Sequence, residues 1–288
     1  MLNQLSSLKL KLLNIGYAKL DHKWDFDNVL SPFARMYLIT VGTAYIYHNN
    51  MKFELKPGYM YLIPSFSYSR YKCDDYHEQY YISFIQEVGK GLSASHLLDF
   101  KYELRASEID QSCFERLLEI NPDRVLLNDD PMVYDNMPSL INFSKKNDEM
   151  SAKHYIETHG ILKILFSRFI ENTAIKQDKT AESNLKKVLI YISENLHEDL
   201  TVDKLADFSN LSRDHFSRSF YKKLGMRPNL YIQSKRVERA QLLLLTTNAA
   251  LVEIAEKVGF GNVSYFSKIF KKFIGQTPGY FRKGQLDI

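Results

Sequence analysis

A segment in the C-terminal third of the chain occurs twice, and this repeat constrains the fold more than any other feature of the sequence. The string FSRSFYKKLGMRP, from Phe216 to Pro228, recurs 50 residues later as FSKIFKKFIGQTP, from Phe266 to Pro278. Six positions are identical, and Arg218 is replaced by another cation, Lys268. Self-similarity at a fixed offset indicates a repeated structural unit. We therefore expect two copies of one small helical module.

Each copy has the signals for a short helix, a tight turn and a longer helix. Gly259 suits a left-handed helix stop, and Asn210 tolerates the same conformation in the first copy. Ser212 and Asn262 stand just before the longer helices, where a side-chain oxygen can accept a backbone N–H bond. This arrangement is that of a helix-turn-helix, whose second helix enters the DNA major groove.

The apolar residues of the longer helices predict which side chains face outward. In the first copy Phe216, Phe220 and Leu224 fall at i, i+4 and i+8, so they must face inward. The predicted DNA contacts are then the outward and flanking residues of the two helices: Arg213, Asp214, Ser217, Arg218, Tyr221, Asn262, Val263, Ser264, Ser267, Lys268 and Lys271. One such helix would be a weak signal, because any three-helix bundle can mimic it. Two copies with matching basic residues favour DNA binding.

The segment between the two copies predicts a rigid connection. Asn229 to Leu245 is expected to form one helix, with Lys235, Arg236 and Arg239 exposed. A helix of this length spans roughly 25 Å, which would let the two recognition helices enter successive major-groove segments about 34 Å apart.

The charge of the chain is unevenly distributed. From Ser183 to Ile288 there are 17 Lys and Arg against 10 Asp and Glu, whereas the rest of the chain is mildly acidic. A basic module favours a polyanionic partner, although a solvated basic face would have the same composition. With 45% hydrophobic and 25% charged residues the chain is of ordinary globular type. No run approaches the ~18 apolar residues of a membrane span. The two cysteines, Cys73 and Cys113, stand far apart in the sequence, which excludes a disulfide framework. We therefore expect a soluble cytoplasmic protein.

The N-terminal half has the periodicity of β-strands. Apolar and charged residues alternate strictly from Met51 to Lys56, which is typical of a half-buried strand. Asn49-Asn50 before it and Pro57-Gly58 after it suit tight turns. Several short strands with turns between them indicate a small sandwich or barrel.

Ten of the 19 tyrosines lie between Tyr37 and Tyr81. A tyrosine offers a flat apolar face and a hydroxyl, which suits a sugar or another small polar ligand, although tyrosines also pack well in strands without any ligand. The residues that we expect to line a ligand pocket are Arg35, Tyr37, Tyr47 and Tyr61.

Helical patterns fill the region between the strands and the repeat. The helix from about Ser151 to Glu171 carries more apolar residues than one small barrel should need. It is therefore either a subunit-contact helix or a helix packed against its own barrel. The polar residues 172–183 indicate a linker.

The region from about Leu185 to Lys283 closely resembles the DNA-binding domain of the AraC/XylS family of bacterial transcription regulators. The string IAEKVGFGNVSYFSKIFKKFIGQTPGYFR, from Ile254 to Arg282, carries this resemblance. It implies that the outward residues of both recognition helices contact bases. The sequence departs from the family at Ala250, where relatives often have a serine that can cap the helix.

The strands of residues 15–90 resemble, more loosely, the cupin-like ligand-binding domain common in this family, chiefly through LKPGYMYLIPSFSY. The resulting fold class is α+β with two domains: an N-terminal cupin-like β-barrel or sandwich with following helices, and a C-terminal all-α domain with two helix-turn-helix units joined by a long helix. The expected limits are 1–110 for the ligand-binding domain, 111–182 for the helical dimerisation region and linker, and 183–288 for the DNA-binding domain.

Metal-binding cupins need several ligands that converge on one ion. Here His48 and His77 stand apart, and Ser69 lies where relatives often have a histidine. We therefore expect no metal and no cofactor.

The expected function is a DNA-binding transcription activator that is not an enzyme. Its expected partners are double-stranded DNA, a small-molecule effector such as a sugar, a second copy bound through the helix near 151–171, and, as a further candidate, RNA polymerase. The alternative is a cupin-type metalloenzyme with an appended helical module. A DNA-repair methyl acceptor would need a reactive cysteine in a basic setting, but both cysteines lie outside the basic half. A third alternative is a bundle that binds another protein. Its affinity for that partner would respond only weakly to salt, unlike the affinity of a DNA-binding module for DNA.

Overall fold

The computed structural model describes residues 6–29, 31–48, 51–88, 94, 98–128, 130, 137–171 and 181–283. The chain divides into two compact units. The β-rich unit consists of Lys9–Gln86 and Leu98–Asn172, and the helical unit consists mainly of Thr173–Asp287. The expected turn at Asn49-Asn50 and most of the expected linker lie outside the described residues.

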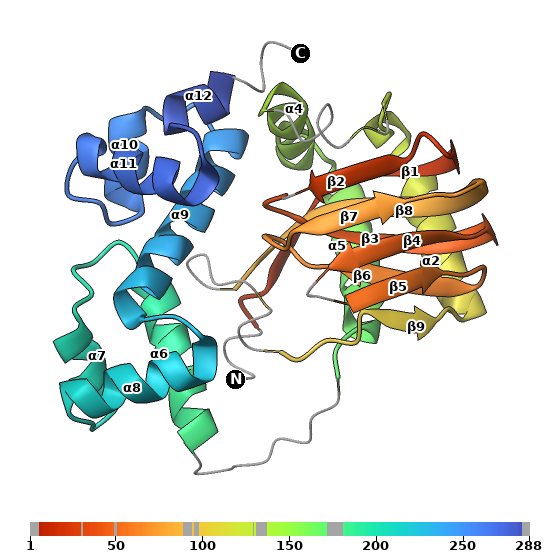
Figure 1. The fold of residues 1–288 in the computed structure, drawn as a ribbon. Coiled ribbons are helices and arrows are strands. Elements are labelled where there is room, and N and C mark those ends of the chain that lie inside the picture. Colours follow the sequence, from red (N-terminus) through yellow and green to blue (C-terminus); the bar gives the residue numbers. More distant parts are fainter. Residues whose placement is uncertain are drawn as a thin grey trace. The chain divides into compact units, whose positions relative to one another are not determined.

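The β-rich unit is a sandwich of two sheets (Figure 1). Its strands are β1 (Lys9–Asp21), β2 (Asp25–Val29), β3 (Ala34–Gly42), β4 (Ala44–His48), β5 (Met51–Leu55), β6 (Tyr59–Ile63), β7 (Ser69–Lys72), β8 (Tyr76–Glu87) and β9 (Glu103–Arg105). One sheet has the order β1-β8-β3-β6-β9 and the other the order β2-β7-β4-β5. Both sheets contribute side chains to one core, including Tyr37 from β3 and Ile46 from β4. The two sheets stay separate, so the described strands close no barrel.

The pairing of β3 with β8 puts two of the expected ligand residues, Arg35 and Tyr37, on one face of the sheet. Arg35 lies opposite Ser83, and Tyr37 lies opposite Tyr81. Because neighbouring residues of a strand point to opposite faces, these four side chains share one side of the sheet. Tyr37 belongs to the core between the sheets, so this shared side faces the sandwich interior.

Helices cover the other side of the larger sheet. They are α2 (Glu108–Glu119), the 3₁₀ turn η2 (Pro122–Arg124), α4 (Met137–Asp148) and α5 (Ala152–Arg168). Arg124 is 1% exposed and donates from Nη1 to the carbonyl oxygens of Leu12, Leu13 and Phe143, which joins η2 and α4 to β1. One face of α5 is buried in its own unit, through residues that include Leu162. The expectation that this helix packs against its own sandwich is therefore met on that face.

The helical unit contains the two expected modules. Its helices are α6 (Ala181–Glu194), α7 (Val202–Phe208), α8 (Arg213–Leu224), α9 (Pro228–Thr246), α10 (Leu251–Lys257), α11 (Val263–Ile274) and α12 (Pro278–Lys283). The first module pairs α7 with α8, and the second pairs α10 with α11 (Figure 1). The single connecting helix α9 packs against α8, α10, α11 and α12. The fold class predicted from the sequence, α+β in two domains, is thus confirmed.

The turn chemistry predicted from the sequence is also confirmed. Asn210, Gly225, Gly259 and Gly275 have φ of 52°, 69°, 87° and 85°, the left-handed region that ends a helix. The Ser212 hydroxyl accepts from the backbone N–H of the third residue of α8, and the Asn262 side chain does the same for α11.

One expectation for α9 is wrong. Lys235, Arg236 and Arg239 are partly buried rather than exposed. Lys235 pairs with Glu238 at 2.8 Å within the helix, and Arg236 donates to backbone carbonyls outside it. The expectation fails because α9 is packed by other helices on more than one side.

Within the described residues, no helix combines the length and the apolar character that crossing a membrane requires.

Candidate nucleic-acid interface and ligand cavity

The helices α8 and α11 each bury a face that carries aromatic side chains, and each exposes the opposite face, which is mainly polar. Phe216 and Phe220 are 3% and 1% exposed, and their equivalents Phe266 and Phe270 are both 0% exposed. The amphipathic pattern fixes how each helix rotates on its module. Of the expected contact residues, Ser217, Val263 and Ser267 are partly buried, and the exposed ones are Arg213, Asp214, Arg218, Tyr221, Asn262, Ser264, Lys268 and Lys271.

The start of α8 carries charged groups with local partners. Arg213 Nη1 lies 3.3 Å from the Asp203 carboxylate of α7, with both side chains more than half exposed. Arg218 donates from Nε to the carbonyl oxygen of Asp214 at 3.3 Å, one turn earlier. These contacts hold both guanidinium groups on the outer side of the helix, where a DNA groove could meet them.

Further exposed polar residues lie on the same two helices, outside the set of contacts predicted from the sequence. His215 and Lys222 are exposed on α8, as are Tyr265 and Lys272 on α11. The Tyr265 hydroxyl accepts from Gln233 Nε2 at 3.0 Å, which ties α11 to α9. Lys222 and Lys272 occupy equivalent positions in the two copies of the repeat, and this match could have identified both from the sequence. Cations near a helix C-terminus also interact favourably with its dipole.

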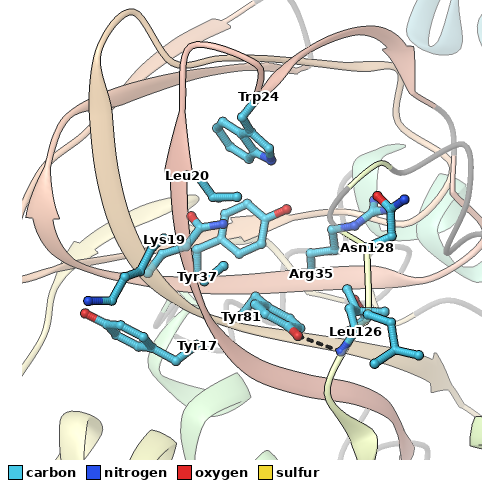
Figure 2. A pocket seen from close by; sticks show the side chains of 13 residues that line it. Tyr17, Lys19, Leu20, Trp24, Arg35, Tyr37, Tyr81, Leu126 and Asn128 are labelled. Atoms are coloured by element: carbon cyan, nitrogen blue, oxygen red, sulfur yellow. Dashed lines mark hydrogen bonds between the residues drawn. The ribbon is translucent and has the colours of Figure 1, made fainter.

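The β-rich unit contains a cavity of about 410 Å³ that is lined by strands of the larger sheet and by residues 126–128. The residues that line it are Tyr17, Ala18, Lys19, Leu20, Trp24, Arg35, Tyr37, Gln79, Tyr81, Ser83, Leu126, Leu127 and Asn128. Figure 2 shows Arg35 extending toward Asn128, with Tyr37 beside it and the Trp24 ring at another edge of the space. The volume falls in the range of small-molecule sites, roughly 300–1,000 Å³.

Two of the four expected ligand residues, Arg35 and Tyr37, line this cavity, and the structure puts the other two elsewhere. Tyr47 lines a more open pocket of about 670 Å³ together with residues such as Arg70. Tyr61 is 2% exposed and donates from its hydroxyl to the carbonyl oxygen of Glu54 at 2.6 Å. Burial raises the pKa of the Tyr61 hydroxyl, and its bond ties β6 to β5 of the other sheet.

The polar side chains of the cavity are deeply buried. Arg35 is 2% exposed, donates to Ser31 Oγ at 2.7 Å, and has its guanidinium 4.7 Å from the ring centre of Phe33. Gln79 is also 2% exposed, and its Oε1 has no hydrogen-bond partner within the described part of the chain. A buried acceptor of this kind is costly unless a donor reaches it.

A hydrogen bond joins two walls of the cavity. The backbone N–H of Leu126 donates to the Tyr81 hydroxyl at 2.8 Å, drawn as the dashed line in Figure 2. Gly16 on β1 makes room for this ring, because a Cβ there would lie 2.2 Å from the Tyr81 hydroxyl. The strand β8 and the segment around Leu126 are thereby held at a fixed separation.

The two strand histidines lie among aromatic rings. His48 is 4% exposed and stacks on Phe53 at 4.7 Å, and His77 is 0% exposed with its ring 4.7 Å from Trp24. Burial lowers the pKa of each imidazole to about 4. The described residues hold no group of three or more His, Cys, Asp or Glu side chains that could bind a metal ion.

Both thiols lack the environment that activates a cysteine. Burial raises the pKa of Cys73 and of Cys113, and nearby carboxylates raise it further. A reactive cysteine needs the opposite, a lowered pKa beside positive charge.

Comparisons with known proteins agree with the helical modules. A family model described as a helix-turn-helix domain matches residues 205–284. AdaA of Bacillus subtilis, a bifunctional transcriptional activator/DNA repair enzyme, is 44% identical over 93 residues, which are 32% of this chain and 44% of AdaA. YisR of B. subtilis, an uncharacterized HTH-type transcriptional regulator, is 26% identical over 267 residues, which are 88% of this chain and 87% of YisR.

A solved structure of the DNA-binding domain of AdpA in complex with a target DNA matches with 31% identity and a TM-score of 0.34, over 35% of this chain and 91% of that chain. The chain spans less than half the length of two of its curated relatives, 44% of AdaA and 41% of YfiF of B. subtilis, an uncharacterized HTH-type transcriptional regulator that is 32% identical over 129 residues. The AdaA match is confined to the helix-turn-helix region, whereas the YisR match extends over both units. Residues 205–284 therefore form a helix-turn-helix domain, and the chain as a whole is similar to an HTH-type transcriptional regulator.

Proposed function

We propose that this chain is a transcription activator that binds DNA with both recognition helices and responds to a small-molecule effector. Residues 1–110 would bind the effector, with residues 126–128 completing the cavity; 111–182 would form the subunit contact, and 183–288 would bind double-stranded DNA. The observation that carries the proposal is the pair of equivalent helices, α8 and α11, that bury matching aromatic faces and expose polar ones in one chain. RNA polymerase is the partner that an activator bound beside a promoter would contact.

The exposed residues of α8 and α11 divide into two chemical classes. Side chains in the N-terminal half of each helix, such as Arg218 and Ser264, can reach base edges, because recognition helices enter the groove with their N-terminal part. Lysines near the helix ends, such as Lys222 and Lys272, suit phosphate oxygens, which set affinity and register but carry no sequence information. The contacts predicted from the sequence are all proposed to belong to this surface: Arg213, Asp214, Ser217, Arg218, Tyr221, Asn262, Val263, Ser264, Ser267, Lys268 and Lys271. Lys222 and Lys272 are added to them as phosphate contacts.

Substitution of Arg218 tests the base-reading role. A DNA site is first selected by the purified chain from a random duplex library. Arg218→Ala should then lose roughly 5- to 150-fold in affinity for that site, the cost of one bidentate arginine–guanine contact, with much less loss on random DNA. Lys222→Ala, the matched removal of a cation from the same helix, should weaken binding to all sequences alike. A uniform loss for Arg218→Ala in mobility shifts would reduce Arg218 to a phosphate contact.

The cavity of the β-rich unit supports the effector part of the proposal. It combines the aromatic side chains of Trp24 and Tyr37 with the buried polar groups of Arg35 and Gln79. Aromatic walls with a few polar side chains suit a sugar or a similar hydroxyl-bearing molecule. The unpartnered acceptor on Gln79 would receive a ligand hydroxyl.

A thermal-shift screen of sugars on the full chain tests this role. A binding sugar should raise the melting temperature of the wild type. Gln79→Ala should lose most of that shift, whereas Lys52→Ala, outside the cavity lining, should keep it. Equal shifts in the wild type and Gln79→Ala would place the effector elsewhere.

The helix α5 supports the homodimer part of the proposal. Opposite its buried face lie Ile156, 70% exposed, and Ile164, 48% exposed. Between them is Gly160, where nothing lies within 4 Å of a Cβ position, so a second helix could approach closely. Sedimentation should give a dimer for the wild type and for the exposed control Lys101→Glu, but a monomer for Ile156→Glu. A monomeric wild type would remove this part of the proposal.

A further inference from the structure

A single side chain on α9 touches both helix-turn-helix modules. Arg236 donates from Nε to the carbonyl oxygen of Leu196 at 2.9 Å and from Nη2 to that of Glu198 at 2.6 Å. Leu196 lies between α6 and α7, and its side chain belongs to the buried cluster that α7 and α8 of the first module form with α6 and α9. The same guanidinium lies 5.6 Å from the ring centre of Phe260, which follows the turn of the second module. Arg236 therefore connects the backbone of one module to an aromatic side chain of the other.

The two modules also meet by direct backbone contact at the same point. A Cβ at Gly259 would lie 2.1 Å from the carbonyl oxygen of Leu196 and 2.9 Å from Nη2 of Arg236. The φ of Gly259 is +87°, a conformation that L side chains rarely adopt. The Leu196 carbonyl thus accepts a bond from Arg236 and touches the turn of the second module.

Arginine suits this joint better than any other cation. Its planar guanidinium can donate to two carbonyl oxygens in one plane and stack on a ring at the same time, which a lysine ammonium does not do. Hydrogen bonds from a charged donor are stronger than neutral ones. Partial burial lowers the pKa of Arg236, as expected for a cation removed from water.

We propose that Arg236 is a positioning residue for DNA recognition, which fixes α8 and α11 relative to each other and so sets the spacing of the two DNA segments that the chain can read. This inference rests on the proposed function, in which both recognition helices bind at once. Two linked modules gain affinity only where their linkage lets both engage. A rigid joint therefore favours one spacing strongly, whereas a loosened joint binds that spacing less well and tolerates others.

The test uses the full chain and three duplexes derived from the site selected from the random library. The first is the selected two-segment site, the second has one segment scrambled, and the third has one base pair inserted between the segments. That insertion moves the second segment by about 3.4 Å and one-tenth of a turn. The wild type should prefer the two-segment site to the scrambled one by roughly 100-fold.

Arg236→Ala should lose about tenfold on the two-segment site but stay within about twofold of the wild type on the scrambled one. Its penalty for the inserted base pair should also be smaller. Arg236→Lys keeps the charge but not the planar fork. Its affinity for the two-segment site should lie between those of the wild type and of Arg236→Ala. Lys257→Ala removes the same charge from an exposed position on α10, and it should keep the spacing preference of the wild type.

Circular dichroism establishes whether each variant is folded at the assay temperature. If Arg236→Ala is unfolded, Arg236→Lys is compared with the wild type in its place. Equal losses on the two-segment and scrambled duplexes, or an unchanged insertion penalty, would overturn the inference. A wild type without any preference for the two-segment site would instead overturn the proposed two-helix reading itself.

Discussion

Burial keeps His48 and His77 neutral in the folded protein, although both are ionisable near neutral pH when exposed. Their relative exposures are 4% and 0%, and burial lowers the pKa of each to about 4. In the unfolded chain a histidine titrates near pH 6.5. Between pH 6.5 and 4 the unfolded state therefore binds more protons, so the free energy of unfolding falls as the pH falls. The full contribution of each imidazole is present above pH 6.5.

The β-rich unit should consequently be less stable at pH 5 than at pH 7, by up to about 2 kcal/mol for each of the two histidines. Urea unfolding can be followed by the fluorescence of Trp24, the one tryptophan of the chain, which lies beside His77. His77→Leu should reduce the difference between the two pH values. His22→Gln, at an exposed position, should not. An undiminished difference in His77→Leu would mean that His77 is not the group that titrates.

At the scale of single elements, the sequence predicted helix faces well and strand faces poorly. The phenylalanines of α8 and α11 recur with helical spacing, so the inward face follows from the pattern. The strand β4 alternates as well, but Ala44 and Ile46 point into the core, which leaves Tyr47 on the opposite face. Alternation alone does not say which face is inward. For this reason the sequence could not say that Tyr47 and Arg35 would line different pockets.

The burial of two other elements, β3 and α9, could not be predicted from the sequence, because it depends on what packs against them. The residues of β3 from Ala34 to Ile39 are all buried, because helices cover the outer side of the larger sheet. This strand therefore shows no alternation of apolar and polar residues. On α9, Arg236 was expected to be exposed, but the segment after α6 packs over it. A pattern based on one buried stripe fails for an element that is covered on several sides.

The first helices of the two modules differ at their caps, and this difference can be tested. Before α7, the Thr201 hydroxyl accepts from the backbone N–H of Lys204 at 3.2 Å. Before α10, Ala250 has the extended backbone of a cap residue but no side-chain acceptor. Only the reverse bond forms there, from the Ala250 N–H to the Glu253 carboxylate at 3.1 Å. A serine at position 250 would complete the reciprocal pair.

Ala250→Ser should therefore raise the free energy of unfolding of the helical unit by about 1 kcal/mol, because it supplies an acceptor for an unpaired N–H at the helix start. Thr201→Ala is the matched control and should lower the same quantity by about 1 kcal/mol. Thermal unfolding followed by far-UV circular dichroism measures both. If Thr201→Ala destabilises while Ala250→Ser changes nothing, the two helix starts do not share one cap geometry.

At the scale of the whole molecule, the positive charge is concentrated where the repeat is. Residues 183–288 carry 17 Lys and Arg against 10 Asp and Glu, although the net charge of the chain is only +4. A basic region could serve either DNA or an acidic protein. Only the first releases condensed counterions on binding, because the DNA backbone holds a dense atmosphere of them. Salt dependence therefore separates the two partners without knowledge of the DNA sequence.

The logarithm of DNA affinity should fall linearly with the logarithm of salt concentration, with a slope of about 0.9 for each phosphate contacted. Lys222 and Lys272 occupy equivalent positions of the two modules. Lys222→Ala and Lys272→Ala should each reduce the slope by about 0.9, and the double variant should reduce it by about 1.8, because the two modules contact separate phosphates. Fluorescence anisotropy with a labelled duplex at several salt concentrations measures these slopes. A wild-type affinity that barely responds to salt would favour a protein-interaction bundle, and an effect of only one lysine would mean that a single module contacts the DNA.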